Sequence, residues 1–106
     1  MYGVIRRYTF KTAQDQKAFD DLKQRIDTKF VPQLNEVRGF HGYYAIRTGN
    51  NQLVTITICE DKAGVTESTR RAAEFVKTDP LKDQLANPEI MEGDLLVSRE
   101  ALAGAR

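Results

Sequence analysis

Arg38-Gly39-Phe40-His41-Gly42-Tyr43-Tyr44-Ala45-Ile46 is the stretch of sequence that decides the fold. It follows an amphipathic segment that ends near Pro32, and its alternating pattern predicts a strand over residues 38–47. The next four residues, Thr48-Gly49-Asn50-Asn51, have the glycine and asparagine content that a tight chain reversal requires. A second alternating segment over residues 53–59 follows at once. The sequence therefore predicts a helix followed by a β-hairpin.

Similar segments lie on both sides of this hairpin. Residues 2–10 alternate in the manner of a strand, and residues 12–30 carry apolar side chains at the spacing of a helix. After the hairpin, a second helix is expected to begin at the N-cap Asp61 and to end at Asp79-Pro80. A last strand is expected over residues 89–99.

This order of strand, helix, strand, strand, helix, strand predicts an α+β fold. It is the ferredoxin-like βαββαβ arrangement, whose sheet is antiparallel. Nothing is left over for another unit, so residues 1–106 are expected to form one domain. Residues 101–106 are small and end in a charged residue, and we expect them to fray.

Each predicted helix has one apolar side. In the first helix Thr12 is the expected N-cap, and Pro32 is expected to end the helix because proline cannot continue the hydrogen-bond ladder. Its buried stripe is Phe19, Leu22, Ile26 and Phe30. The buried stripe of the second helix is Val65, Thr69, Ala72, Ala73 and Val76. Both helices therefore have a face that can pack on the sheet.

Composition and charge narrow the range of partners. Sixteen Lys and Arg residues balance fifteen Asp and Glu residues, for a formal charge of +1 at pH 7. A chain so nearly neutral has no broad field for nucleic acid or anionic lipid, so neither partner is expected. The N-terminus lacks the apolar core of a signal peptide, and no apolar run approaches the ~20 residues that cross a membrane. One cysteine and one histidine cannot build a structural zinc site, so no metal is expected and a cytoplasmic location fits best.

The predicted sheet has more apolar surface than two helices can cover. Val54, Ile56 and Ile58 form the more apolar side of their strand, and we expect this side to meet the helices. The opposite face is then expected to carry Phe40, Tyr44, Tyr2, Val4 and Tyr8. Two copies that pack these faces about a two-fold axis would bury them, which predicts a homodimer. The alternative is a monomer whose outer face carries scattered aromatic residues.

Three motifs, taken in order, resemble those of a known superfamily. They are Pro32-x-Leu34, then Val37-x-Gly39-Phe40-x-Gly42-Tyr43-Tyr44, and finally Glu60-Asp61-Lys62-Ala63-Gly64 at the start of the second helix. From Tyr2 to Arg99 the chain resembles the dimeric α/β-barrel superfamily and, within it, the antibiotic-biosynthesis-monooxygenase-like branch. The resemblance implies two ferredoxin-like sheets that pack face to face as a dimeric α/β barrel.

The resemblance implies more than one activity, because this branch includes oxygenases, haem-degrading enzymes and members of no known function. Its oxygenases act on aromatic polyketides without metal or flavin and bind them with Asn, Trp, Tyr and Arg side chains. This chain has no tryptophan, so that set cannot be matched residue by residue. The haem-degrading members use a histidine on a helix, whereas the single histidine here, His41, lies at the start of a strand. We therefore expect neither haem nor another cofactor.

The sequence identifies no catalytic residue, but it offers five candidates for substrate binding: Arg6, Arg7, Tyr8, His41 and Tyr44. Arg6 and Arg7 are neighbours in a strand, so they point to opposite faces and one of them lies near the core or the dimer seam. That arginine either binds an anionic substrate or pairs with Asp94 or Glu60 across the sheet.

The other candidates also have two interpretations. His41 acts as a general acid or base between two glycines that let a ligand approach, or it is a solvated residue at a strand edge. Tyr43 and Tyr44 donate protons or pack in the sheet. Cys59 is either a nucleophile or an inert core thiol. Lys62 is the one basic residue near it in sequence, which favours the inert thiol.

Arg38-Gly39-Phe40 also resembles the start of an RNA-binding motif found in domains with this order of elements. That motif belongs on the third strand, whereas these residues lie on the second. His41 and Gly42 replace the residues that should follow, and the net charge is nearly zero. The sequence therefore argues against RNA recognition.

Two functions remain. The first is a small homodimeric, cofactor-independent monooxygenase-like enzyme that acts on a hydrophobic or aromatic small molecule. The second is a non-catalytic ligand-binding or interaction module with the same fold. An apolar cavity with a convergent Tyr, His or Arg favours the enzyme, and a filled interior favours the module.

Overall fold

The structure is a computed structural model, and it describes residues 1–100. Its four strands are β1 (Tyr2–Thr9), β2 (Phe40–Gly49), β3 (Gln52–Cys59) and β4 (Glu89–Asp94), and they lie in the order β2-β3-β1-β4. The helical elements are α1 (Gln16–Arg25), the π-helical turn η1 (Ile26–Phe30), α2 (Val31–Leu34), α3 (Lys62–Thr78) and the 3₁₀ turn η2 (Lys82–Gln84). All strand pairs are antiparallel, so the chain has the predicted ferredoxin-like βαββαβ fold. The tail expected to fray, residues 101–106, lies outside the described residues.

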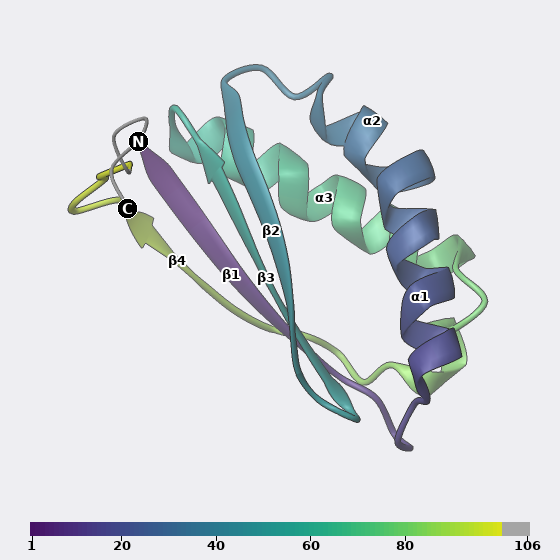
Figure 1. The fold of residues 1–106 in the computed structure, drawn as a ribbon. Coiled ribbons are helices and arrows are strands. Elements are labelled where there is room, and N and C mark those ends of the chain that lie inside the picture. Colours follow the sequence, from purple (N-terminus) through teal and green to yellow (C-terminus); the bar gives the residue numbers. More distant parts are fainter. Residues whose placement is uncertain (101–106) are drawn as a thin grey trace.

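The helices lie on one side of a curved sheet, and no described element covers the other side (Figure 1). Two groups of buried apolar side chains join the layers. The larger consists of Phe10, Phe19, Leu22, Ile26, Phe30, Leu34 and Ala72. The smaller consists of Val4, Val37, Cys59 and Val65. The core therefore lies entirely between the inner face of the sheet and the helices.

The prediction of which sheet face meets the helices was wrong. Val54, Ile56 and Ile58 face away from the helices, and they lie beside the outward-facing residues of β1 and β2 on the same face of the sheet. Tyr2, Val4 and Tyr8 share the inner face with Phe10. Burying the large aromatic rings of the central strand β1 removes more apolar surface from water than burying three aliphatic side chains of β3, and this decides the orientation.

A β-bulge at the start of β2 explains a second error of orientation. Phe40 lies opposite Cys59 and Gly42 lies opposite Ile58, so two steps along β2 match one step along β3. Phe40 and Tyr43 therefore both pack on the inner side. Among the residues predicted for the outer face, Tyr44 alone lies there, with 60% of its surface exposed.

The first helix continues past Pro32, contrary to the prediction. The Val31 N–H donates to the Ile26 carbonyl, which is the longer hydrogen bond of a π-helix, and a further helical turn follows to Leu34. Pro32 thus occupies the first turn of α2, where an N–H is not needed. The N-cap of α1 is Asp15, not Thr12, because an Asp15 carboxylate oxygen accepts the Ala18 N–H at 2.8 Å.

The second helix has the predicted ends, but its buried stripe differs from the prediction, because Ala73 is exposed and Ser68 is buried. An Asp61 carboxylate oxygen accepts the Gly64 N–H at 3.0 Å, which confirms the N-cap, and α3 ends just before Asp79-Pro80. The last strand is shorter than predicted and stops at Asp94. None of the helices in residues 1–100 combines the length and the apolar character that crossing a membrane requires.

Candidate ligand-binding site

A small cavity lies between the inner face of the sheet and the helices. Its volume is about 40 Å³. Its apolar lining consists of Phe10, Leu22, Ile26, Phe30, Leu53, Ala72, Phe75, Val76 and Leu85. Its polar lining consists of Arg6, Tyr8, Tyr43, Thr55 and Asp79. A space of this volume holds one or a few water molecules and is too small for an aromatic ring.

Two open grooves adjoin this cavity on opposite sides. The α1–β2 groove has a volume of about 600 Å³, and its lining includes Phe19, Lys23, Val31, Phe40, Ala45 and Arg47. It shares Leu22, Ile26, Tyr43 and Leu53 with the cavity. The α3–β4 groove has a volume of about 460 Å³ and runs between α3 and residues 82–90. It shares Arg6, Tyr8, Val76 and Leu85 with the cavity.

Arg6 is the most unusual residue of the site, because its guanidinium is buried without a carboxylate partner among residues 1–100. Only 1% of Arg6 is exposed. Its Nη2 donates to Ser68 Oγ at 2.9 Å, its Nη1 donates to Thr57 Oγ1 at 3.1 Å, and its Nε donates to Thr69 Oγ1 at 3.4 Å. Three of the five guanidinium N–H groups are thus used, which leaves two without an acceptor among residues 1–100. Burial lowers the pKa of Arg6, because a charged group loses its hydration there.

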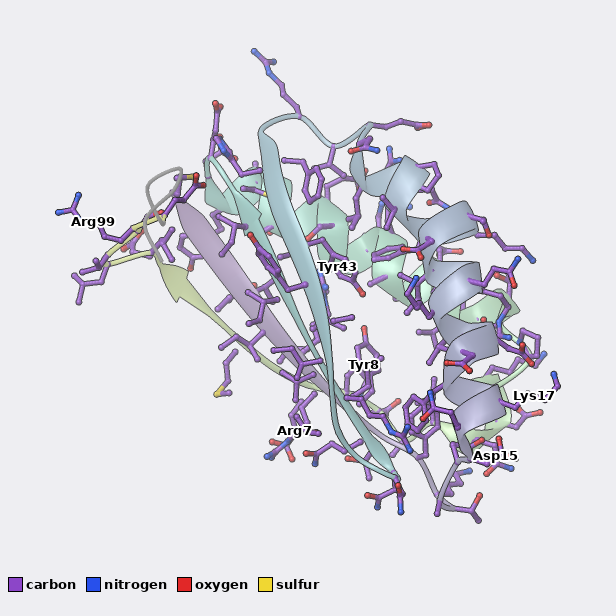
Figure 2. The ribbon with its side chains drawn as sticks, viewed as in Figure 1. Arg7, Tyr8, Asp15, Lys17, Tyr43 and Arg99 are labelled. Atoms are coloured by element: carbon purple, nitrogen blue, oxygen red, sulfur yellow. The ribbon has the colours of Figure 1, made fainter. Side chains whose placement is uncertain are left out.

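Two tyrosines extend toward the helices from the same face of the sheet. Tyr8 comes from β1 and Tyr43 from β2, and both point into the space between sheet and helices (Figure 2). Burial raises the pKa of Tyr8, and the Arg6 charge offsets part of this increase. Burial also raises the pKa of Tyr43, and the neighbouring Tyr8 adds to the effect. Both phenols are therefore neutral at physiological pH and can donate hydrogen bonds to a ligand.

Thr55 adds an unused polar atom to this group. It lies on β3 directly opposite Arg6, and its Oγ1 is buried without a hydrogen-bond partner among the described residues. A buried hydroxyl without a partner is destabilising by roughly 1–3 kcal/mol. The unused hydroxyl and the unused N–H groups of Arg6 line one apolar cavity. This arrangement suits a ligand that has an apolar body and an electron-rich oxygen.

Asp79 is the carboxylate nearest the cavity, but it is already occupied. Its Oδ1 accepts from Arg25 Nε at 2.7 Å, and its Oδ2 accepts from Arg25 Nη2 at 3.1 Å and from the Leu81 N–H at 3.0 Å. The pair joins α1 to the end of α3 and is largely buried. Asp79 therefore closes the end of the cavity instead of neutralising Arg6.

The structure brings together two of the five residues predicted to bind substrate, Arg6 and Tyr8. Arg7 lies on the outer face and pairs with Glu89 (Figure 2). His41 lies in the bulge of β2, half exposed, with Nε2 at 3.8 Å from Glu60 Oε1. Tyr44 is on the outer face. These three side chains do not reach the cavity.

Sequence reasoning missed the residues that surround Arg6. Tyr43, Thr55, Thr57 and Ser68 are not among the five residues that the sequence predicts to bind substrate. One signal in the sequence could have pointed to them: a buried arginine needs hydrogen-bond acceptors close to its guanidinium. Cys59 is fully buried, and burial raises the pKa of its thiol, which agrees with an inert core residue. Within residues 1–100, no three His, Cys, Asp or Glu side chains are placed to hold a metal ion.

Comparisons with known proteins identify the fold. No protein-family profile and no curated protein matches the sequence. Among solved structures, a protein of unknown function from Nitrosomonas europaea is 19% identical with a TM-score of 0.70, and the alignment covers 95% of this chain and 94% of that one. A dimeric ferredoxin-like protein from an uncultured marine organism is 9% identical with a TM-score of 0.68, and the coverage is 94% and 98%.

A third similar structure has a described activity. It is a mutant of SnoaB, a cofactor-independent oxygenase from Streptomyces nogalater, which is 13% identical with a TM-score of 0.63 over 92% of this chain and 94% of that one. At these identities the similarity shows the fold and not the activity. The chain therefore has the predicted ferredoxin-like fold, which it shares with proteins described as dimeric ferredoxin-like and with one described as an antibiotic biosynthesis monooxygenase.

Proposed function

We propose that the protein binds an aromatic small molecule with an acidic hydroxyl group and oxidises it with molecular oxygen, without a cofactor. The observation that carries the proposal is the buried guanidinium of Arg6, which has no counter-ion among the described residues and two unused N–H groups. A cation in such a position lowers the free energy of an adjacent anion, such as a phenolate or enolate. An ionised substrate of this kind is a better electron donor than its neutral form.

The α1–β2 groove is the place for the body of this molecule. The cavity itself is too small for a ring, whereas the groove has about 600 Å³ and shares Tyr43 and Leu53 with the cavity. A ring that lies in the groove can direct its oxygen toward Tyr43 and Tyr8, whose neutral phenols donate hydrogen bonds. The Arg6 charge then acts on this oxygen through the low-dielectric cavity.

The chemistry balances without an added reductant. A substrate that loses two hydrogen atoms and gains one oxygen atom from O₂ releases the second oxygen atom as water, and the substrate supplies all the electrons. The protein has to ionise the substrate, exclude water and admit oxygen. Arg6 serves the first task by stabilising the substrate anion, so that the hydroxyl proton passes to solvent water, and the apolar lining of the cavity serves the second.

Oxygen uptake with a panel of phenols and quinols tests the proposal. We expect uptake with at least one compound, and we expect Ala45→Trp to abolish it, because Ala45 is an exposed residue that lines the α1–β2 groove. Tyr43→Phe should lower kcat/KM by roughly 10- to 100-fold through the loss of one hydrogen bond in the transition state. Binding without uptake would contradict catalysis and support a non-catalytic binding module. No binding by any compound would contradict both functions.

We also propose that the protein is a homodimer in which the outer faces of two sheets pack together. The outer face carries Ile5, Tyr44, Ile46 and Met91, which are 38–61% exposed, together with Val54, Ile56 and Ile58. A surface of this kind is unusual for a monomer. Similar structures are described as dimeric ferredoxin-like proteins, which supports the proposal.

Ile56→Asp tests this dimer. Ile56 lies on the inner strand β3, between Ile5 of β1 and Tyr44 of β2, near the centre of the face. Because both protomers carry the substitution, a two-fold interface contains it twice, and we expect the dissociation constant of the dimer to rise by about 100-fold or more. Sedimentation of the wild type, of Ile56→Asp and of the exposed α3 control Thr66→Asp measures the effect. A wild-type monomer, or a variant that remains dimeric, would exclude the face-to-face arrangement.

A further inference from the structure

We propose that the α3–β4 groove is a second binding site, which takes an organic carboxylate and presents its two oxygens to Arg6 from the side opposite the α1–β2 groove. The site shares Arg6 with the proposed function but does not depend on oxidation. Arg6 and Tyr8 line this groove as well as the cavity, whereas neither lines the α1–β2 groove, so the α3–β4 groove gives the more direct approach to the guanidinium.

The two grooves differ in charge. In the α3–β4 groove, Arg6, Lys77 and Lys82 are opposed by Asp83 alone, which gives the lining a formal charge of +2. In the α1–β2 groove, Lys23 and Arg47 are balanced by Asp20 and Asp27, so its lining is neutral. A concave surface with one sign of charge concentrates ions of the opposite sign. The α3–β4 groove is therefore the one that attracts an anion.

The charges of this groove are not cancelled by ion pairs in the described part of the chain, with one exception at the rim. Lys77 Nζ lies 3.7 Å from Glu74 Oε1, and both side chains are exposed, so water screens this pair. Lys82 has no ion-pair partner among residues 1–100. Arg6 is bonded to three hydroxyl groups, which carry no charge. An incoming anion thus meets a cation that has no counter-charge in the described part of the chain.

The remaining lining of the groove indicates what the anion is attached to. Most of the other side chains are apolar: Ala73, Val76, Leu85, Ala86, Pro88 and Ile90. The two unused N–H groups of Arg6 suit the two oxygens of a carboxylate, which guanidinium binds with parallel hydrogen bonds. A groove with an apolar wall and a guanidinium at its inner end fits a compact carboxylic acid with a hydrophobic body.

Calorimetric titration with sodium benzoate at constant ionic strength tests the site. We expect the wild-type protein to bind benzoate. Lys82→Glu lowers the formal charge of the lining from +2 to zero, and it should weaken binding by roughly tenfold or more. Ala73→Trp fills the groove from an exposed position of α3 and should abolish binding. The two variants act by different means, so a folding defect in one leaves the other as a test.

Matched variants in the other groove serve as controls. Lys23→Glu makes the same change of charge in the α1–β2 groove, and Ala45→Trp fills that groove. Both should bind benzoate as the wild type does. No binding by the wild type, unchanged binding in Lys82→Glu and Ala73→Trp, or loss of binding in Ala45→Trp would overturn the second site. Oxygen uptake that is abolished by Ala45→Trp would still support the proposed function, so the two proposals fail separately.

Discussion

Arg6→Met is expected to raise the free energy of unfolding while it abolishes ligand binding. A buried charge without a carboxylate partner is destabilising, because hydroxyl groups replace only part of the lost hydration. Methionine fills a similar volume without a charge, and replacing buried charges by apolar residues has stabilised other proteins by roughly 1–4 kcal/mol. Ser68 keeps its bond to the Val65 carbonyl, whereas Thr57 and Thr69 lose the one side-chain partner that each has among residues 1–100, so we expect a gain toward the lower end of this range.

Urea denaturation measures the stability part of this prediction. Arg70→Met is the control, because Arg70 is an exposed α3 residue that pairs with Glu67, and water screens this pair, so its loss should change the free energy of unfolding little. A residue kept for function at the expense of stability is a common feature of binding sites. If Arg6→Met is instead clearly less stable than the wild type, Arg6 is a structural residue and the proposed site loses its basis.

Asp79→Ala should have the largest destabilising effect of any substitution near the cavity. The Asp79 carboxylate is almost fully buried, and it accepts two hydrogen bonds from Arg25 and one from the Leu81 N–H. Its removal leaves the Arg25 guanidinium largely buried without a partner and opens the turn after α3. Breaking a buried ion pair from one side is destabilising by about 3–5 kcal/mol, and we expect this range.

Thermal and urea unfolding of Asp79→Ala and Asp21→Ala provides the comparison. Asp21 pairs with Lys17 on the surface of α1 at 2.7 Å, so the distance is similar but water screens the charges. Its loss should change the free energy of unfolding far less than the loss of Asp79 does. Equal effects of the two substitutions would show that burial does not strengthen the Arg25–Asp79 pair.

The order of elements was predictable because it depends on local patterns. Alternation, amphipathic spacing and the caps around α3 all lie within short stretches of the chain. The errors arose where the regular period is interrupted. The π-helical turn before Pro32 inserts an extra residue into a helix, and the bulge between Phe40 and Gly42 inserts one into a strand. Neither insertion has a clear signature in one sequence, and each changes the face of the residues that follow.

The candidate site was predictable in part for a related reason. The alternation of β1 showed that Arg6 or Arg7 must lie inside the fold, but it did not show which, because that choice depends on the packing of the whole sheet. The partners of Arg6 come from β3 and from Ser68 and Thr69 of α3, more than fifty residues away. A serine in an amphipathic helix is usually a surface residue, so sequence alone does not indicate that Ser68 is buried.

Titration of 4-nitrophenol is the most direct test of the claim that Arg6 stabilises an anionic ligand. The absorbance of this probe distinguishes its phenolate from its neutral form. A bound probe beside the Arg6 cation should have a lowered pKa. At a pH about one unit below the pKa of the free probe, the phenolate band should therefore grow as wild-type protein is added. Arg6→Met should not produce this change, and the exposed control Arg70→Met should behave as the wild type does. A probe that binds without ionising, or that ionises equally with Arg6→Met, would contradict the role of Arg6.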